Sequence, residues 1–256
     1  QALKDLINLN NINILWLTKA LFDQIFLAEE DIFIKIKYLL VGGEKLNSHT
    51  VSQLLRSQNA PTNFINGYGP TEGTTFTTLS NIKAIEASQD VLIGKPLHNR
   101  TCYILNPDLT PLPVGAIGEL YIGGEGVARG YLNQLKLTAE KFIKNPFQSS
   151  EEKACEKNGR LYKTGDLVRW LSDGNIEYIG RNDLQVKIRG FRIEVEEIEH
   201  ILSAHEKISQ TIVVVYEQNG ESSENKYLVA YYVSKTHVEE EALLNYLKLH
   251  LPSYML

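Results

Sequence analysis

The sequence has few cysteines, little net charge and no long apolar run, and each shortage excludes a class of protein. Its two cysteines, Cys102 and Cys155, provide neither a disulfide framework nor the spacing of a zinc site. The formal net charge of −5 gives no bulk attraction to nucleic acid or to an anionic membrane. No apolar run approaches the roughly 20 residues that a membrane-spanning helix needs. We therefore expect a cytoplasmic protein that binds neither nucleic acid nor membrane.

The usual terminal signals are also missing from the 256 residues. Gln1 is not an initiator methionine, and no signal-peptide pattern follows it. The last residues, Leu251 to Leu256, do not read as a natural tail. We expect the chain to be a fragment of a longer protein, and its length allows more than one domain.

Residues 1–90 alternate short apolar runs with helical patterns. Strands are expected at residues 12–17, 37–41 and 62–65, with helices at about 18–28 and 48–58. This alternation predicts parallel βα units. The carboxyl ends of the strands would then meet at one rim, with Trp16, Gly42 and Gly67 close together, where open α/β sheets bind ligands.

Residues 91–182 change to short strands broken by Gly, Pro and Asp. Strands are expected at residues 101–105, 118–122 and 176–179, and together they predict a small antiparallel β-barrel. Gly123 to Gly126 resemble a phosphate loop but lack its lysine and spacing, so we interpret them as a structural turn. We interpret the polar residues 149–153 as a mobile loop.

A third pattern begins at residue 183. Strands are expected at residues 185–189, 211–216 and 227–233, helices at 194–203 and 239–249, and a loop at 219–223. The predicted fold class is therefore α/β. Parallel βα units and an antiparallel β-barrel form residues 1–182, and a compact α+β module forms residues 183–256.

The stretch from Asn66 to Glu72 concentrates several chemical abilities. Two glycines and Pro70 preset a tight turn at which backbone can approach a ligand. Tyr68 offers a flat face, Thr71 a hydroxyl, and Glu72 a hard oxygen ligand of the kind that magnesium prefers. From these residues alone an ordinary strand-to-loop turn is an equal alternative.

Further motifs follow this stretch in a fixed order. They are residues 118–124 (GELYIGG) with 128–131 (ARGY), 162–167 (YKTGDL), 180–183 (GRND) with 185–194 (QVKIRGFRIE), and 251–255 (LPSYM). Together with residues 66–72 (NGYGPTE) they resemble the C-terminal half of an adenylation domain of a nonribosomal peptide synthetase, in the adenylate-forming enzyme superfamily.

The resemblance implies ATP and Mg²⁺ as cofactors and an amino acid as substrate. Such a domain forms an aminoacyl adenylate and pyrophosphate, then passes the acyl group to the phosphopantetheine thiol of a peptidyl carrier domain. A small MbtH-like helper protein is a further possible partner. The first reaction spreads negative charge over phosphate oxygens, which requires preplaced cations and donors.

The resemblance also implies roles for individual residues. The catalytic residues would be Thr71 on a phosphate oxygen, Glu72 on magnesium, and Lys187 in the second reaction. The nucleotide would contact Gly43, Glu44, Asn66, Tyr68, Asp166, Tyr178 and Arg181, with Asp166 on the ribose hydroxyls and the two tyrosines on adenine. Asp183 would be the hinge of a mobile C-terminal module. The alternatives are a solvated loop carboxylate for Glu72, strand packing for Tyr178, and an exposed strand face for Lys187.

The amino-acid pocket would be lined by Trp16, Leu40, Gly42, Gly67, Thr75 and Phe76. None of these side chains is charged, so a charged substrate would lose hydration without gaining a partner. Trp16 and Phe76 would fill space, while Gly42 and Gly67 would leave a narrow slot. This set resembles valine-activating domains, so we expect L-valine, with isoleucine or leucine as weaker substrates.

Three parts of the family pattern are missing from these residues. They are the phosphate loop with its lysine, the aspartate that pairs with the substrate amino group, and a late lysine. We therefore expect that the chain alone does not catalyse adenylation at a useful rate. The rival interpretations are a free-standing acyl- or aryl-CoA ligase and a non-catalytic scaffold. A metal hydrolase is not favoured, because His200 and His205 do not share a helix face.

Overall fold

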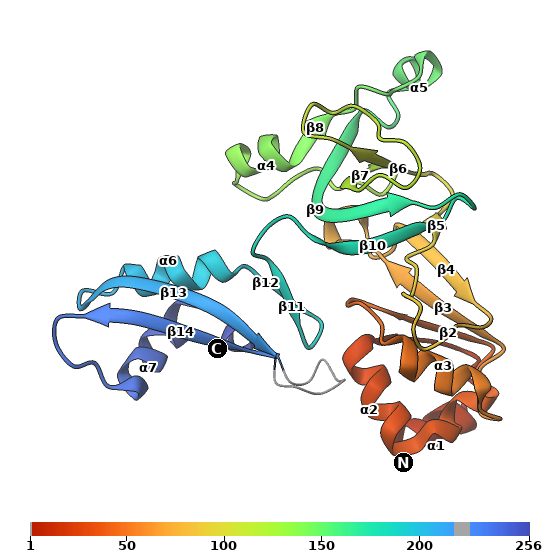
Figure 1. Cartoon of the computed structure of the whole chain (residues 1–256), viewed down its shortest axis with the longest axis horizontal. Coiled ribbons are helices and arrows are strands. Elements are labelled where there is room, and N and C mark those ends of the chain that lie inside the picture. The colour runs from red at the N-terminus through yellow and green to blue at the C-terminus, as the bar shows by residue number, and fades with distance from the viewer. Residues whose placement is uncertain (1, 218–225) are drawn as a thin grey trace. The chain divides into compact units, whose positions relative to one another are not determined.

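The computed structural model describes residues 2–217 and 226–256, so the loop expected at 219–223 lies outside the described residues. The chain divides into two compact units between Asn182 and Asp183 (Figure 1). Asp183 is the residue that the resemblance marks as a hinge. None of the helices within the described ranges is long and apolar enough to cross a membrane.

The large unit begins with a mixed sheet and its helices. Its elements are α1 (Ala2–Leu9), β1 (Ile14–Thr18), α2 (Lys19–Glu29), the 3₁₀ helix η1 (Glu30–Lys35), β2 (Tyr38–Gly42), α3 (Ser48–Arg56), β3 (Asn63–Tyr68), the 3₁₀ helix η2 (Thr71–Gly73), β4 (Thr78–Ile82) and β5 (Lys95–Pro96). Strands β1, β2 and β3 are parallel, in agreement with the predicted βα units. Strands β4 and β5 continue the sheet antiparallel, which was not predicted.

Alternation along these strands separates a core face from an open face. Leu39 and Phe64 are fully buried and pack with Phe22 of α2, on the side where Figure 1 shows the helices. Trp16 and Leu40 are neighbours in the register and point to the opposite face. Side-chain caps start the helices: Thr18 accepts from the Leu21 N–H, and Asn47 accepts from the N–H groups of residues 49 and 50.

The register brings the strand ends together at one edge of the sheet. Thr18 lies opposite Gly42, and Gly42 lies opposite Gly67. Because parallel strands end on the same side, the segments that follow all three leave from this rim.

The second sheet of the large unit is antiparallel throughout. Its elements are β6 (Arg100–Leu105), β7 (Gly118–Gly124), α4 (Leu135–Lys141), β8 (Phe142–Lys144), α5 (Ser150–Ala154), β9 (Arg160–Trp170) and β10 (Ile176–Arg181). The strand order is β10-β9-β7-β6, with β8 also on β9. The antiparallel pairing agrees with the prediction for residues 91–182, but these pairings describe a sheet with two edges, and a closed barrel does not follow from them.

The mobile loop predicted at residues 149–153 is wrong. Ser149 caps α5 by accepting from the Glu152 N–H at 3.1 Å, and the Glu152 carboxylate accepts from the Ser149 N–H at 2.8 Å. This reciprocal pair is a capping box, which satisfies two otherwise unpaired donors at a helix start. The Ser-x-x-Glu spacing was present in the sequence and its meaning was overlooked.

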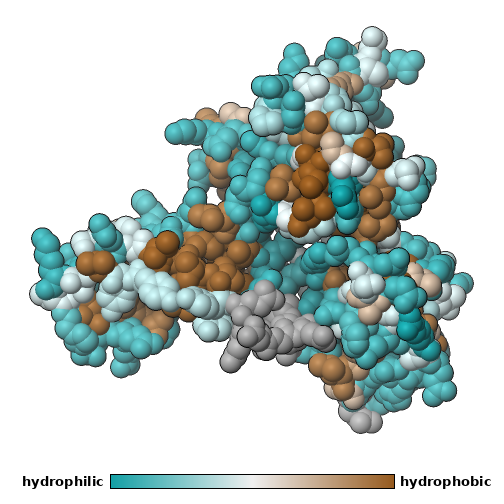
Figure 2. Space-filling view, in the orientation of Figure 1, coloured by the Kyte–Doolittle hydropathy of each residue, from teal (hydrophilic) through white to brown (hydrophobic). Residues whose placement is uncertain are grey.

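Within its described residues, the small unit contains two hairpins and two α-helices. Its elements are β11 (Val186–Ile188), β12 (Phe191–Ile193), α6 (Val195–Ser203), β13 (Ile208–Glu217), β14 (Lys226–Ser234), α7 (Glu240–His250) and the 3₁₀ helix η4 (Ser253–Met255). Val213 of β13 packs with Leu202 of α6 and Leu243 of α7 in one core. The other face of β13 and β14 exposes Tyr216 and Tyr231, and Figure 2 shows apolar residues gathered on this unit.

Gly94 ties the two sheets of the large unit together. Its carbonyl accepts from the Ile176 N–H at 2.8 Å, while the Ile176 carbonyl accepts from the Ile93 N–H at 3.1 Å. Gly94 has a φ of +85°, and a Cβ there would lie 1.9 Å from the Leu79 carbonyl oxygen. This position therefore tolerates only glycine.

We predict that Gly94→Ala destabilises the large unit far more than Gly115→Ala. Gly115 has a similar φ of +87° but no atom within 4 Å of the Cβ position, so alanine there costs only about 1–2 kcal/mol of backbone strain. Gly94→Ala adds a backbone clash, and we expect at least about 2 kcal/mol more. Both tryptophans, Trp16 and Trp170, lie in the large unit, so urea unfolding followed by tryptophan fluorescence measures it. Equal losses in the two variants would contradict the clash.

Candidate active site

A buried carboxylate, Asp166 of β9, is the centre of the candidate site. It is only 5% exposed. The hydroxyl of Tyr68, from the other sheet, donates to its Oδ2, and Nη1 of Arg181 donates to its Oδ1 at 2.7 Å. Asp166 and Arg181 lie opposite each other in the β9–β10 register. Three strands from two sheets therefore meet at this carboxylate.

Thr164 supports the same cluster from β9. Its hydroxyl accepts from the Asp166 N–H at 3.0 Å and donates to the Leu120 carbonyl at 2.7 Å. Its carbonyl accepts from Nη2 of Arg181 at 3.2 Å. The Thr-Gly-Asp sequence is thus explained residue by residue: the threonine fixes the backbone from which Asp166 projects.

Burial makes these partners necessary. The side chains of Arg181 and Asp166 are 12% and 8% exposed, so their charges have lost most of their hydration. Removing one member of such a pair leaves an uncompensated charge and typically costs about 3–5 kcal/mol. The resemblance implied a nucleotide contact for both residues but did not indicate that they bind each other.

Tyr68 and Tyr178 lie together, as the resemblance implied, but they differ in exposure. Their ring centroids are 6.5 Å apart with an interplanar angle of 43°. Tyr68 is buried, whereas Tyr178 of β10 is half-buried. Burial, followed by the negative charge of Asp166, raises the pKa of Tyr68 well above its usual value. Its hydroxyl therefore stays protonated and remains a donor to Asp166.

Glu72 is held at the start of the loop that follows β3. It lies in η2 and is 8% exposed. Its carbonyl accepts from the Ala128 N–H at 2.8 Å, and the hydroxyl of Tyr131 donates to its Oε1 at 2.6 Å. Thr71, beside it, is exposed. Tyr131 lies within the ARGY motif, but the resemblance did not indicate it as a site residue.

The predicted amino-acid pocket is closed more tightly than its two glycines suggest. The rings of Trp16 and Phe76 meet edge to face, with centroids 6.2 Å apart. A Cβ at Gly67 would lie 2.5 Å from the Phe76 ring, and a Cβ at Gly42 would lie 2.2 Å from the Gly67 carbonyl oxygen. The glycines therefore do not open a slot, because Phe76 and the neighbouring strand occupy that space. Leu40 lies beside Trp16 in the register.

The loop before Phe76 has an unusual backbone. Thr74 and Thr75 both have a φ of +58°, in the left-handed region that residues with a Cβ rarely adopt. The Thr74 hydroxyl donates to the Gly126 carbonyl at 2.8 Å. This conformation turns the chain so that Phe76 covers Gly67, and such strain is often found at functional sites.

Gly43 and Asn66 have different surroundings at the rim. Gly43 has a φ of +95° and no atom within 4 Å of its Cβ position, so the backbone beside Glu44 is open to a ligand. The side-chain amide of Asn66 is buried and donates to the Leu92 carbonyl at 2.8 Å. The Asn66 side chain therefore braces the sheet, a role that the sequence did not indicate.

Lys187 and Asp183 belong to the small unit. Lys187 lies on β11 opposite Arg192, and Oδ1 of Asp183 accepts from the Gln185 N–H at 3.2 Å. Their roles in catalysis and as a hinge remain predictions.

The residues present fit a nucleotide and a magnesium ion. A carboxylate offers about four acceptor positions, and Tyr68 and Arg181 use two of those on Asp166, so a ribose diol can also be accepted. Across residues 2–217 and 226–256, no group of three or more His, Cys, Asp or Glu could hold a metal. A single carboxylate such as Glu72 suits magnesium, which is commonly held by one or two carboxylates together with substrate phosphates.

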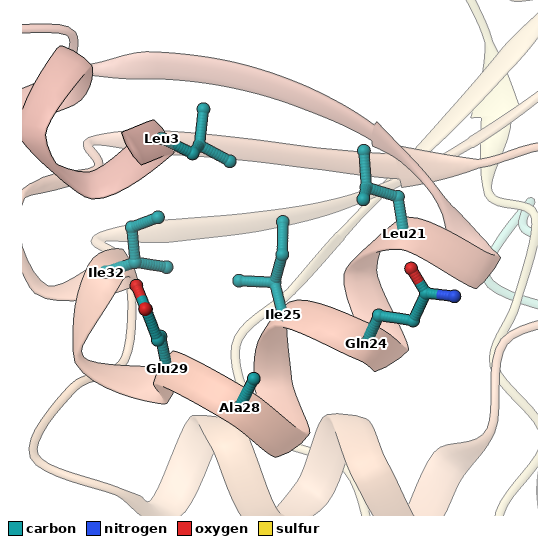
Figure 3. A pocket seen from close by; sticks show the side chains of 7 residues that line it. All are labelled: Leu3, Leu21, Gln24, Ile25, Ala28, Glu29 and Ile32. Carbon is teal, nitrogen blue, oxygen red and sulfur yellow. The ribbon is translucent and has the colours of Figure 1, made fainter. Parts of the chain in front are cut away.

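A pocket elsewhere in the large unit shares none of these residues. It has a volume of about 250 Å³ and lies between α1, α2 and η1 (Figure 3). Its lining is mostly apolar and includes Leu21, Ile25 and Ile32. Its polar lining residues are Gln24 and Glu29.

We predict that the stability lost in Tyr68→Phe shrinks at alkaline pH. An unfolded tyrosine ionises near pH 10, whereas folded Tyr68 keeps its proton because its pKa is raised. The contribution of Tyr68 to the free energy of unfolding is therefore complete below pH 10 and is lost as the pH rises further. At pH 8 the variant should be less stable by about 1.5–3 kcal/mol, the value of a hydrogen bond to a charged group. The deficit should narrow by about 1 kcal/mol between pH 10 and pH 11. Urea unfolding at each pH measures it; a constant deficit would contradict the assignment.

Comparison with known proteins points to one family. The family model described as AMP-binding enzyme matches residues 1–132. Gramicidin S synthase 2 of Brevibacillus brevis is 44% identical over 255 residues, which are 100% of this chain and 5% of that synthase. The chain thus spans a small fraction of the curated relatives it matches.

Solved structures give the same result. An artificially fused adenylation–PCP di-domain nonribosomal peptide synthetase from Klebsiella oxytoca superposes with a TM-score of 0.82 at 30% identity, over 100% of this chain and 45% of that chain. A four-domain nonribosomal peptide synthetase bound to AMP and glycine matches 99% of this chain and 18% of its own, with a TM-score of 0.61 and 34% identity. The chain therefore belongs to the AMP-binding enzyme family, as part of an adenylation domain of the nonribosomal peptide synthetase type.

Proposed function

We propose that this chain is part of an enzyme that activates a small branched aliphatic amino acid, L-valine foremost, as its adenylate. ATP would supply the adenylyl group, and the aminoacyl group would pass to the phosphopantetheine of a carrier domain. The observation that carries the proposal is the buried Asp166, whose two oxygens are held by Tyr68 and Arg181.

This cluster suits the ribose and base of ATP. Asp166 is held in place by the donors around it, so it accepts hydroxyl hydrogen bonds without having to reorganise. Tyr178 offers a half-buried ring for the base, and stacking on such a ring contributes about 1–3 kcal/mol. Gly43, with open space beside it, lets the edge of the base approach the backbone.

Glu72 and Thr71 suit the phosphates. A bound magnesium ion would neutralise negative charge on the phosphate oxygens, and Glu72 would hold it there. The exposed hydroxyl of Thr71 would donate to a phosphate oxygen. Both residues lie in η2, directly after β3, at the rim where the parallel strands end.

The Trp16–Phe76 pair argues for a small apolar side chain. The two rings lie edge to face, and Phe76 occupies the space beside Gly67, so little room is left for a large side chain. None of Trp16, Leu40 and Phe76 can neutralise a charged substrate. A missing or extra methylene changes binding in such a pocket by only about 1–3 kcal/mol, so isoleucine and leucine should be activated more weakly than valine.

The division of the chain at Asp183 supports a second step in the same enzyme. A hinge at Asp183 would let the small unit, with Lys187 on β11, take a different position for transfer of the acyl group. The di-domain structure similar to this chain joins adenylation and PCP domains, which supports a carrier domain as the partner.

We predict that the adenylation domain containing this chain catalyses amino-acid-dependent ATP–pyrophosphate exchange with the highest kcat/KM for L-valine. Across the proteinogenic amino acids, isoleucine and leucine should follow at roughly 10- to 200-fold lower values. Aspartate and lysine should give no signal above background. Glu72→Gln should lower exchange with valine by at least about 100-fold.

The other outcomes assign the protein differently. Preference for another apolar amino acid would keep the enzyme and overturn the pocket assignment. Activity only with carboxylic acids and CoA would identify an acyl- or aryl-CoA ligase. Absence of both exchange and nucleotide binding would leave the non-catalytic scaffold.

A further inference from the structure

Tyr131 is built into the site as a fixed hydrogen-bond donor. It belongs to the segment between β7 and α4, 59 positions from Glu72, and its hydroxyl donates to Glu72 Oε1 at 2.6 Å. The backbone of the same segment is bonded to Glu72 as well, since the Ala128 N–H donates to the Glu72 carbonyl at 2.8 Å. The segment thus holds both the main chain and the carboxylate of this residue.

Packing against neighbouring aromatic rings fixes the orientation of the Tyr131 ring. The ring meets Phe142 edge to face with centroids 5.4 Å apart, and Phe142 packs on Tyr162 at 5.0 Å. The Tyr162 hydroxyl lies 3.4 Å from the Tyr131 hydroxyl. These contacts place the hydroxyl with little freedom, and its bond to Glu72 is short, as expected for a donor on a carboxylate.

The backbone of Tyr131 is fixed by Thr138. The Thr138 hydroxyl accepts from the Tyr131 N–H at 2.9 Å. Gly130 allows this approach, because its φ is +144° and a Cβ there would lie 2.4 Å from Cγ2 of Thr138. The Gly-Tyr pair is therefore needed as a unit: the glycine admits Thr138, and Thr138 orients the tyrosine.

We propose that Tyr131 is a positioning residue that sets the direction of the Glu72 carboxylate toward magnesium. This inference rests on the proposed function, in which Glu72 holds the metal. A carboxylate can rotate about its side-chain torsions, and a metal is bound well only when its ligands are already oriented. Groups that orient ligands in this way typically change metal affinity 10- to 100-fold when removed.

The expected effect of Tyr131→Phe is a shift in the magnesium requirement. This variant keeps the ring on Phe142 and removes only the hydroxyl. Binding of radiolabelled ATP to the adenylation domain, measured by equilibrium dialysis, is titrated with MgCl₂. The magnesium concentration at half-maximal binding should rise 10- to 100-fold. A merely structural role would lower the amount of active protein without moving this half-point.

Two reference variants make the outcome decisive. Tyr121→Phe removes another tyrosine hydroxyl, one whose pKa is raised mainly by burial and also by the nearby Glu119 carboxylate in the same unit, and should leave the half-point unchanged. Glu72→Gln should shift the half-point at least as far as Tyr131→Phe. In the Glu72→Gln background, adding Tyr131→Phe should cause no further shift.

The failures of the two proposals can be told apart. An unchanged half-point in Glu72→Gln would overturn the metal assignment within the proposed function. A shift in Glu72→Gln without one in Tyr131→Phe, or equal shifts in Tyr131→Phe and Tyr121→Phe, would overturn only the positioning role. If Tyr131→Phe does not fold, Thr138→Val loosens the same tyrosine, and an unchanged half-point there overturns the inference.

Discussion

The large unit depends on one electrostatic constraint, the need to compensate a carboxylate that folding has buried. Asp166 is only 5% exposed, and Arg181 and Tyr68 both donate hydrogen bonds to its carboxylate, which offsets the cost of burying it. Arg181 comes from the neighbouring strand of the same sheet, whereas Tyr68 comes from the other sheet, 98 positions away. The bonds that stabilise the charge therefore also fix the two sheets relative to each other, so the nucleotide site and the packing of the large unit rest on the same contacts.

A second tyrosine–carboxylate hydrogen bond joins the two sheets, with the tyrosine on the side of the second sheet. Tyr68 extends from the first sheet to Asp166 in the second, and Tyr131, in a segment that follows the second sheet's β7, extends back to Glu72 beside the first. Each pair joins a phenol whose pKa is raised, mainly by burial, to a carboxylate with a proposed role toward ATP. Such phenols remain protonated donors throughout the physiological pH range. The two carboxylates are thereby held in fixed directions, as preorganised sites require.

The sequence predicted those features that depend on local pattern. Apolar runs located the parallel strands and their common rim, and motifs located Glu72 and Asp166. It did not predict contacts made across the chain, such as the hydroxyl of Tyr131 on Glu72, because nothing in the ARGY motif states its partner. Phe76 filling the space beside Gly67 depends on two threonines with positive φ, which composition does not reveal. Strand β4 was not predicted because its sequence mixes polar and apolar residues without a clear apolar run. The Ser-x-x-Glu spacing of the capping box at Ser149, by contrast, is visible in the sequence.

The claim that Asp166 receives the ribose of ATP is tested most directly by nucleotide affinity. The measurement compares ATP with 2′,3′-dideoxy-ATP, which lacks both ribose hydroxyls, on the adenylation domain and on its Asp166→Asn variant. Two hydrogen bonds to a charged acceptor should make ATP bind at least about 100-fold more tightly to the wild-type domain, and the variant should lose most of that preference. Equal affinity of the wild-type domain for the two nucleotides would contradict the account, because Asp166 would then not contact the ribose.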